Sequence, residues 1–331
     1  MNELGETLTQ TILSTTGASA ITGQELIQNL WSGYGQIIRL TLAGGTHPTV
    51  IIKHVQTDTQ SEHPRGWNTD LSHQRKLRSY QIEASWYQNW SEQYDEQCRT
   101  PKLIGGSEYE GELLLILEDL DASGYPLRLQ SLNWSQVESC LAWLANFHVT
   151  SLGKTPTDLW EVGTYWHLAT RPDELAALTD CSLQAAAPAI DKKLSSARYQ
   201  TLVHGDAKLA NFCFSLDGSQ VAALDFQYIG GGCGMKDVAY FLGSCLDEAT
   251  CEAREDELLN LYFHHFTRAL AIHHPEVDAS AVVTEWRDLY PFAWADFHRF
   301  LKNWSPDHWK LNSYSEKMVR KAMASLERES T

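Results

Sequence analysis

The sequence lacks any long hydrophobic run. No stretch of about eighteen apolar residues, the length that a membrane helix needs, occurs in the chain of 331 residues. Glu3 and Glu6 stand where a secretory signal would have basic residues before an apolar stretch. We therefore expect no membrane partner and a cytoplasmic location.

Closely spaced cysteines and positive charge are also scarce. The seven cysteines are scattered and form no C-x-x-C pair, which is typical of reduced thiols and makes a zinc site a poor expectation. The 26 Lys and Arg face 42 Asp and Glu, for a formal net charge of −16, and both halves of the chain are acidic. No basic stripe remains for a phosphate backbone, so we expect no nucleic-acid partner.

What is present is the composition of a globular protein, with 43% hydrophobic and 21% charged residues. The sequence patterns predict strands mainly before residue 120 and helices mainly after it. We expect two lobes, residues 1–119 and 120–331, in an α+β fold. The expected elements are a helix over 1–30, a β-hairpin over 31–55, a surface loop over 56–71, a helix over 72–90, a strand over 111–120 and a helix over 131–152.

A second hairpin is predicted around Asp217-Gly218, because both residues tolerate the positive φ of a type I′ turn. If the turn centres on these two residues, the numbers of paired residues sum to 435. Residue 211 then faces residue 224, and Asn211 lies beside Asp225. Two polar groups should therefore meet at the open end of this hairpin.

These polar groups fit phosphoryl transfer, which needs a positioned triphosphate, magnesium and a carboxylate that orients the attacking hydroxyl. Asp206, in an irregular loop after His204-Gly205, could accept a hydroxyl proton. Asn211 and Asp225 offer the oxygen ligands that magnesium prefers.

Here the sequence resembles the protein-kinase-like small-molecule phosphotransferases, which include aminoglycoside phosphotransferases, choline kinases and ecdysteroid-kinase-like proteins. The family's catalytic loop reads H-G-D-x-x-x-x-N, and "HGDAKLAN" over residues 204–211 matches it, while "LDFQ" supplies the metal-binding Asp. The resemblance implies a two-lobed protein-kinase-like fold with ATP and Mg²⁺ between the lobes. It makes Asp206 the catalytic base, Asn211 and Asp225 the magnesium ligands, and Lys208 a contact of the γ-phosphate.

The upstream half offers the remaining parts of a nucleotide site. Lys53 on a predicted strand fits the lysine that grips the α- and β-phosphates, and Glu83 on the following helix fits the buried carboxylate that pairs with this lysine and fixes it. Gly33 and Gly35 in "WSGYGQ" would let the backbone approach the phosphates. Residues 118–120, with Glu118 and Leu120, fall where the family's hinge holds adenine. Asp237 matches the acid that follows the metal motif, and we interpret it as a helix cap and a brace for the loop.

Several features have less specific interpretations. The pairs His264-His265 and His273-His274 lack carboxylate or cysteine companions, and glycines 230–232 have no P-loop spacing, so we expect packing histidines and a flexible connecting loop. The aromatic stripe from Trp286 to Trp304 has helical spacing, which is typical of core residues. Its alternative role is an acceptor pocket.

The predicted reaction is transfer of the γ-phosphoryl group of ATP to a hydroxyl of a small molecule. Residues 285–310 are the expected acceptor wall, and their carboxylates, such as Asp296 and Asp307, would favour an apolar or cationic alcohol such as an amino alcohol or a sterol-like alcohol. A protein kinase is disfavoured, because Asp225 and Asp237 leave no room for an activation segment. A catalytically silent nucleotide-binding regulator of the same fold stays the alternative, and the oligomeric state is not predicted.

Overall fold

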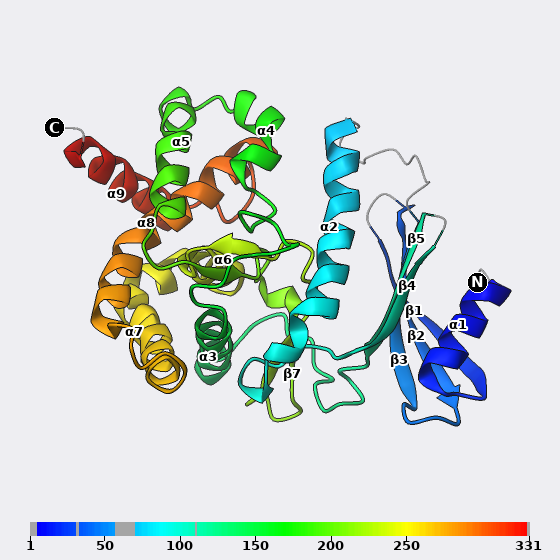
Figure 1. The fold of residues 1–331 in the computed structure, drawn as a ribbon. Helices are drawn as coiled ribbons and strands as arrows, with labels where there is room; N and C mark the ends of the chain where they lie inside the picture. The colour runs from blue at the N-terminus through cyan, green and yellow to red at the C-terminus, as the bar shows by residue number, and fades with distance from the viewer. Residues whose placement is uncertain (1–4, 31–32, 57–69, 110, 330–331) are drawn as a thin grey trace.

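The computed structural model describes residues 5–30, 33–56, 70–109 and 111–329, and its first part is built on one antiparallel sheet (Figure 1). The five described strands follow the order β1-β2-β3-β5-β4. Their bounds are β1 Ala20–Asn29, β2 Gly35–Ala43, β3 Thr49–Gln56, β4 Leu103–Tyr109 and β5 Glu112–Glu118. The predicted hairpin over 31–55 and the strand before residue 120 are confirmed.

The two faces of this sheet pack against different partners because side chains alternate along a strand. Helix α1 (Glu6–Thr16) buries Ile12 in a small core with Ile38 and Ile52 of the sheet. The opposite face turns Val55 toward the large core, to which Trp86 of helix α2 (Asp70–Asn89) also belongs. Trp86 stacks on Phe226 of the C-terminal part at 4.7 Å, so α2 connects the two parts of the molecule.

The rest of the chain is mainly helical, as the sequence predicts. Its α-helices are α3 Trp134–Thr150, α4 Pro172–Ala176, α5 Cys181–Ser195, α6 Met235–Cys245, α7 Glu248–His273, α8 Ala279–Trp304 and α9 Ser313–Glu329. Short strands β6 Thr201–Val203 and β9 Gly230–Gly232 pair with each other, as do β7 Phe212–Phe214 and β8 Val221–Ala223. Single 3₁₀ turns lie at Ser91–Gln93, Glu96–Cys98, Leu168–Thr170 and Leu209–Asn211.

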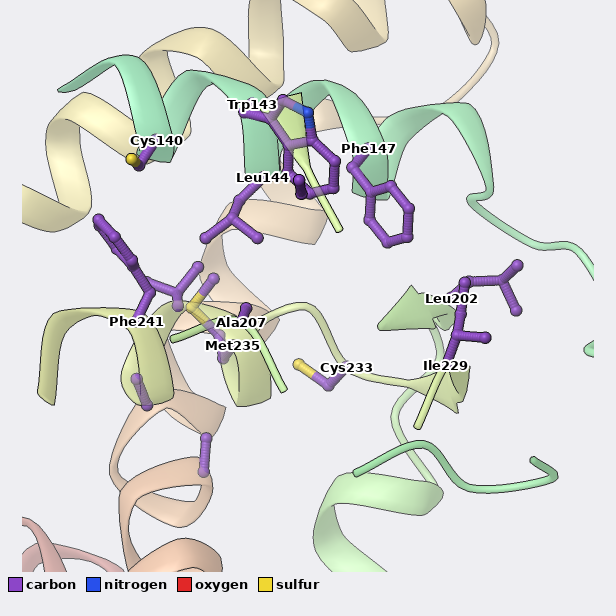
Figure 2. Close-up of a cluster of buried hydrophobic side chains, with 14 of the residues drawn as sticks. Cys140, Trp143, Leu144, Phe147, Leu202, Ala207, Ile229, Cys233, Met235 and Phe241 are labelled. Carbon is purple, nitrogen blue, oxygen red and sulfur yellow. The ribbon is translucent and has the colours of Figure 1, made fainter. Parts of the chain in front are cut away.

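Helix α3 forms the centre of the C-terminal core. Asn133 caps it, accepting a hydrogen bond from the backbone of Gln136, whose side chain accepts one from the Asn133 backbone in return. Side chains of α3, including Trp143 and Phe147, face those of α6 and β6 in the large buried cluster (Figure 2). This packing fixes the segment between β6 and α6, which carries the catalytic-loop motif.

The register of the second predicted hairpin is confirmed. Phe212 pairs with Ala223 and Phe214 with Val221, so that each pair sums to 435. The turn type differs from the prediction, because Gly218 has a positive φ of 72° whereas Asp217 does not. The carboxylate of Asp217 instead accepts hydrogen bonds from the Ser215 hydroxyl and the Ser219 backbone, which stabilise a longer turn.

Two predictions of local structure are wrong. The helix predicted over 1–30 ends at Gly17, whose φ of 66° is left-handed, and residues 20–29 form the edge strand β1. The glycines over 230–232 are not a flexible loop but strand β9. A Cβ at Gly230 would lie 2.2 Å from the Trp160 carbonyl oxygen, so close backbone packing explains a glycine there.

Three other expectations from the sequence concern a loop, membrane helices and the division into lobes. The predicted loop over 56–71 falls mostly on residues outside it. No helix within the described ranges is long and apolar enough to cross a membrane. The division at residues 119 and 120 stays a prediction, since the large core continues from α2 into the helical part.

Candidate active site

A cleft of about 1340 Å³ lies between the sheet and the helical part. Its wall on the sheet side includes Arg39, Lys53 and Asp119, and we call this the sheet side. Its opposite wall includes Tyr165, Phe297, Leu301, Trp304 and Lys310, and we call this the aromatic side. Asp206, Lys208, Asn211 and Asp225 also line the cleft. The structure thus brings the residues of both predicted motifs to one cavity.

Lys53 points into this cleft from the middle of the sheet. Its strand pairs on both sides, with Ile37 of β2 and Leu115 of β5, which holds the backbone in place. The Nζ atom donates to Glu83 Oε2 at 2.5 Å and lies 3.5 Å from Asp225 Oδ1. The predicted approach of Lys53 and Glu83 is confirmed.

The buried pair is held as an ion pair by its surroundings. Burial opposes the charge of Lys53, but the charges of Glu83 and Asp225 prevail and raise its pKa. Burial and the charge of Asp225 outweigh Lys53 at Glu83 and raise the pKa of that carboxyl. The raised pKa of Lys53 favours its charged form, whereas the raised pKa of Glu83 favours the neutral carboxyl. We infer an ion pair, because Lys53 faces two carboxylates.

The catalytic loop, residues 204–211 before β7, needs a glycine at position 205 and a buried carboxylate at position 237. Gly205 has a φ of 78°, and a Cβ there would lie 2.1 Å from the Tyr228 carbonyl oxygen. The fully buried Asp237 carboxylate accepts hydrogen bonds from the backbone N–H groups of His204 at 2.6 Å and Gly205 at 2.9 Å. Asp237 thus braces the loop as predicted, but Gly234, not Asp237, is the N-cap of α6.

This loop presents Asp206 to the cleft with its oxygens already oriented. Lys208 Nζ donates to Oδ2 at 2.8 Å, and Asn211 Nδ2 donates to the same oxygen at 3.1 Å. The Tyr240 hydroxyl donates to Oδ1 at 3.1 Å. Asp206 is buried, with 4% of its surface exposed, so these three donors fix one orientation of a carboxylate at the cleft wall.

Asp225 follows β8 in a left-handed backbone conformation, with a φ of 70°. Burial alone would raise its pKa, but the charges of Lys53 and Lys208 prevail and hold the pKa of Asp225 below its usual value. Gln227 Nε2 donates to Asp225 Oδ1 at 2.7 Å, and Gln227 Oε1 accepts from Lys76 of α2 at 2.8 Å. No role was predicted for Gln227, although it is the last residue of the "LDFQ" segment.

The donor set here fits a magnesium ion. Asn211 uses its Nδ2 atom within the loop, which leaves its carbonyl oxygen available, and Asp225 adds an ionised carboxylate. Within the described chain, no cluster of three or more His, Cys, Asp or Glu residues could hold a metal alone. Magnesium commonly takes one or two protein ligands together with substrate phosphates, so two oxygen donors are sufficient.

The glycine-containing turn lies next to the cleft without its glycines reaching the wall. Gly33 and Gly35 both have positive φ, of 73° and 135°, and the Leu30 N–H donates to the Gly35 carbonyl at 2.8 Å. Leu30 and Tyr34 of this turn line the cleft. The first two residues of "WSGYGQ" lie outside the described chain, and a phosphate contact of the glycines stays a prediction.

The predicted hinge carries a network of ion pairs. Glu118 accepts hydrogen bonds from Arg99 at 2.5 Å and from Ser123, and both Glu118 and Leu120 line the cleft. Beside them, Arg39 of β2 pairs with Asp119 at 2.8 Å. These charges are already compensated, so the hinge offers a firm backbone rather than free side chains.

The predicted acceptor wall over 285–310 needs a correction. Asp296 is fully buried, bonded to Arg299 at 2.6 Å and to the Trp166 indole at 2.9 Å, and Asp307 is exposed. Neither carboxylate lines the cleft. Trp294 packs in the core against Tyr314. Only the last part of the stripe, with Phe297, Leu301 and Trp304, reaches the cleft. The carboxylates that suggested a cationic acceptor are therefore absent from this wall.

A cation lies on the aromatic side instead. Lys310, in the connection between α8 and α9, places Nζ 4.6 Å from the ring centre of Tyr240 and 5.6 Å from that of Phe297. Burial lowers the pKa of Lys310 to about 8. Tyr240 links this lysine to the loop, because its hydroxyl donates to Asp206. No spacing signal in the sequence pointed to Lys310.

Comparison with known proteins agrees with these features. The ecdysteroid kinase-like family model matches residues 166–274, which include the loop of Asp206, the hairpin and α6. The resemblance is confirmed. The family is one of small-molecule kinases. None of the curated proteins matches this sequence.

A solved structure with a TM-score of 0.50 shows the same fold, and others are similar over most of the chain. An ethanolamine kinase from Plasmodium vivax matches with a TM-score of 0.50 and 12% identity, over 95% of this chain and 85% of that one. An aminoglycoside phosphotransferase from Streptomyces rimosus, solved with ADP and streptomycin, has a TM-score of 0.44 and 16% identity over 88% and 98%. A choline/ethanolamine kinase family protein from Mesorhizobium loti has a TM-score of 0.41 and 11% identity over 96% and 94%. The fold is protein-kinase-like.

Proposed function

We propose that the protein is an ATP-dependent kinase that transfers the γ-phosphoryl group to a hydroxyl of a small molecule. The observation that carries the proposal is the single cleft that contains Lys53 of the sheet together with Asp206, Asn211 and Asp225. These residues come from segments more than 150 positions apart, and each has the chemistry that phosphoryl transfer requires.

Each residue has a distinct role in this proposal. Lys53, fixed by Glu83, binds the α- and β-phosphates, and the backbone of residues 118–120 holds the adenine. Asn211 and Asp225 would hold Mg²⁺, which would supply charge neutralisation on the phosphates. Lys208 Nζ lies 2.8 Å from Asp206 Oδ2, and from this position the ammonium group can turn to contact the γ-phosphate.

Asp206 is the proposed general base. As the acceptor's hydroxyl oxygen forms its bond to the γ-phosphorus, the bond from that phosphorus to the β,γ-bridging oxygen breaks and ADP leaves. Asp206 takes the hydroxyl proton. The donors on both of its oxygens keep the carboxylate directed at the acceptor, which reduces the entropy cost of the reactive arrangement.

Two substitutions test these roles against each other. Asp206→Asn should lower kcat by at least about a hundredfold while the Kd of Mg-ATP stays within about twofold, because a base contacts the acceptor and not the triphosphate. Asp225→Ala should weaken Mg-ATP binding as well as turnover. Calorimetry with Mg-ATP and a coupled ADP assay over a panel of alcohols measure both.

The outcomes separate the candidate functions. Equal loss of Mg-ATP affinity in both variants would contradict the division of roles. Tight Mg-ATP binding by the unaltered protein with no transfer to any alcohol would instead favour the silent regulator.

A further inference from the structure

The aromatic side of the cleft has a positive charge surplus in a protein that is strongly acidic overall. Arg75 of α2, Arg171 before α4 and Lys310 all line this cavity. The carboxylates that line it are Glu83, Glu118, Asp119, Asp206 and Asp225. Four of them pair with a cation of the sheet side, Asp225 through Lys53 Nζ at 3.5 Å, and Asp206 pairs with Lys208.

Arg75 hydrogen-bonds to neutral oxygens and not to a carboxylate. Its guanidinium donates to the Thr170 carbonyl at 2.8 Å and to the Ser72 hydroxyl at 3.1 Å, and it forms no ion pair within the described part of the chain. Burial and the like charge of Arg171 lower the pKa of Arg75, although Glu174 and Asp173 oppose this effect. Glu174 itself is engaged by Arg171 at 2.8 Å. Arg75 is therefore left without a carboxylate in direct contact among the described residues.

Aromatic rings join this arginine pair to Lys310. The Arg171 guanidinium lies 5.3 Å from the ring centre of Phe300, and Phe300 and Tyr240 both contact Tyr165, at 5.6 and 5.8 Å. Lys310 lies over the Tyr240 ring. Tyr165 and Tyr240 line the cleft, and the buried Phe300 lies behind them, so this row of rings has a cation at each end. Asp206 is adjacent to the Lys310 end through Tyr240.

The cations of this wall should favour anionic ligands over cationic ones. A cationic alcohol on these rings would meet Lys310 on the same faces, and like charges in a partly buried site disfavour binding. A carboxylate or another anionic group would instead gain charge-assisted hydrogen bonds from a guanidinium that lacks an acidic partner.

We propose that the phosphoryl acceptor is an anionic alcohol, with an apolar body on the aromatic side, its hydroxyl at Asp206 and its anionic group at Arg75 and Arg171. This inference rests on the proposed function and replaces the apolar or cationic acceptor that the sequence favoured. The carboxylates behind that expectation, Asp296 and Asp307, lie in the core and in solvent.

The test compares acceptors that differ only in charge. One set is para-hydroxymethylbenzoate, its methyl ester and para-hydroxymethylbenzylamine. A second set has a hydroxylated steroid carboxylic acid, its methyl ester and the matching primary amine. Binding to the full chain is measured by calorimetry in the presence of magnesium and a non-hydrolysable ATP analogue, and transfer is measured with ATP.

The acid should bind about 10- to 100-fold more tightly than the ester or amine in at least one set, the range expected for a hydrogen-bonded charge. Arg75→Gln should remove this preference without changing binding of the ester, and Arg75→Lys should restore part of it. Arg78→Gln is the matched control, since Arg78 is an exposed residue of the same helix that lies over Trp160 and outside the cleft. Lys310→Gln should also weaken binding of the acid.

The outcomes distinguish this inference from the proposed function. Equal or tighter binding of the ester or amine in both sets would overturn the anionic acceptor, and their phosphorylation would leave the kinase proposal standing. An acid that binds with the expected preference but receives no phosphoryl group would contradict the kinase proposal and would leave an anion-binding site that is not an acceptor site.

Discussion

The two sides of the cleft differ in how their charges are compensated. On the sheet side, Lys53 pairs with Glu83 and Arg39 pairs with Asp119, so the side chains are fixed before any ligand arrives. On the aromatic side, Lys310 lies over rings and Arg75 bonds to neutral oxygens. A cavity with one neutralised wall and one positive wall can bind a magnesium-complexed nucleotide on the first and still attract an anion to the second.

The largest loss of activity is expected from a substitution of Lys53 on the sheet side. Lys53→Met should lower kcat/KM by about a thousandfold, or about 4 kcal/mol, because the phosphates lose a fixed cation and Glu83 loses its partner. Steady-state kinetics measure the loss, with circular dichroism to confirm folding. Lys321→Met is the control, because it breaks a surface pair with Glu255 at 3.0 Å that contributes little. A similar activity in both variants would contradict the assigned role.

The next largest effect separates the two halves of the aromatic stripe on α8. Trp294→Ala should lower the free energy of unfolding by about 3 kcal/mol, because it leaves a cavity beside Tyr314, and should not change the acceptor KM. Phe297→Leu should cost less stability and raise the acceptor KM, because Phe297 lines the cleft. Urea unfolding and acceptor kinetics distinguish the two. A raised KM in the Trp294 variant alone would place the acceptor elsewhere.

A smaller effect is expected at the brace of the catalytic loop. Asp237→Asn replaces an acceptor oxygen by an amide N–H that faces the backbone donors of His204 and Gly205. We expect kcat to fall about 30-fold, or about 2 kcal/mol, with the KM for ATP nearly unchanged. Asp247→Asn, at the exposed N-cap of α7, is the control for the substitution itself. A loss of stability with kcat unchanged would make Asp237 a purely structural residue.

The catalytic-loop residues and the lysine of the sheet side were largely predictable, because short sequence segments identify them. "HGDAKLAN" and "LDFQ" hold Asp206, Asn211 and Asp225 at fixed spacing, and the hairpin register follows from one turn. Lys53 and Glu83 follow from a strand and a helix of clear periodicity.

The aromatic side was not predictable in this way. Arg75, Arg171 and Lys310 belong to three separate segments, which only the folded chain brings to one cavity. Asp296 has the same side chain as a ligand-binding carboxylate, and only its burial against Arg299 reveals a structural role. The strand at 20–29 was missed because it is an edge strand with exposed apolar residues, such as Leu26 and Ile27, and no regular alternation of burial.

The smallest expected effect is a pH-dependent change in stability that comes from the protonation of Lys310 on the aromatic side. Its pKa of about 8 in the folded chain lies below the 10.5 of an unperturbed lysine, so between these values the unfolded chain binds more protons and stability rises with pH. The variant Lys310→Met lacks this dependence. It should therefore be more stable than the unaltered protein below pH 8, by about 1 kcal/mol after allowance for solvent screening, and this gap should close by about pH 10.5. Denaturant unfolding of both proteins across this pH range measures the gap. A difference that stays constant with pH would show that Lys310 is not held at a lowered pKa by the aromatic side.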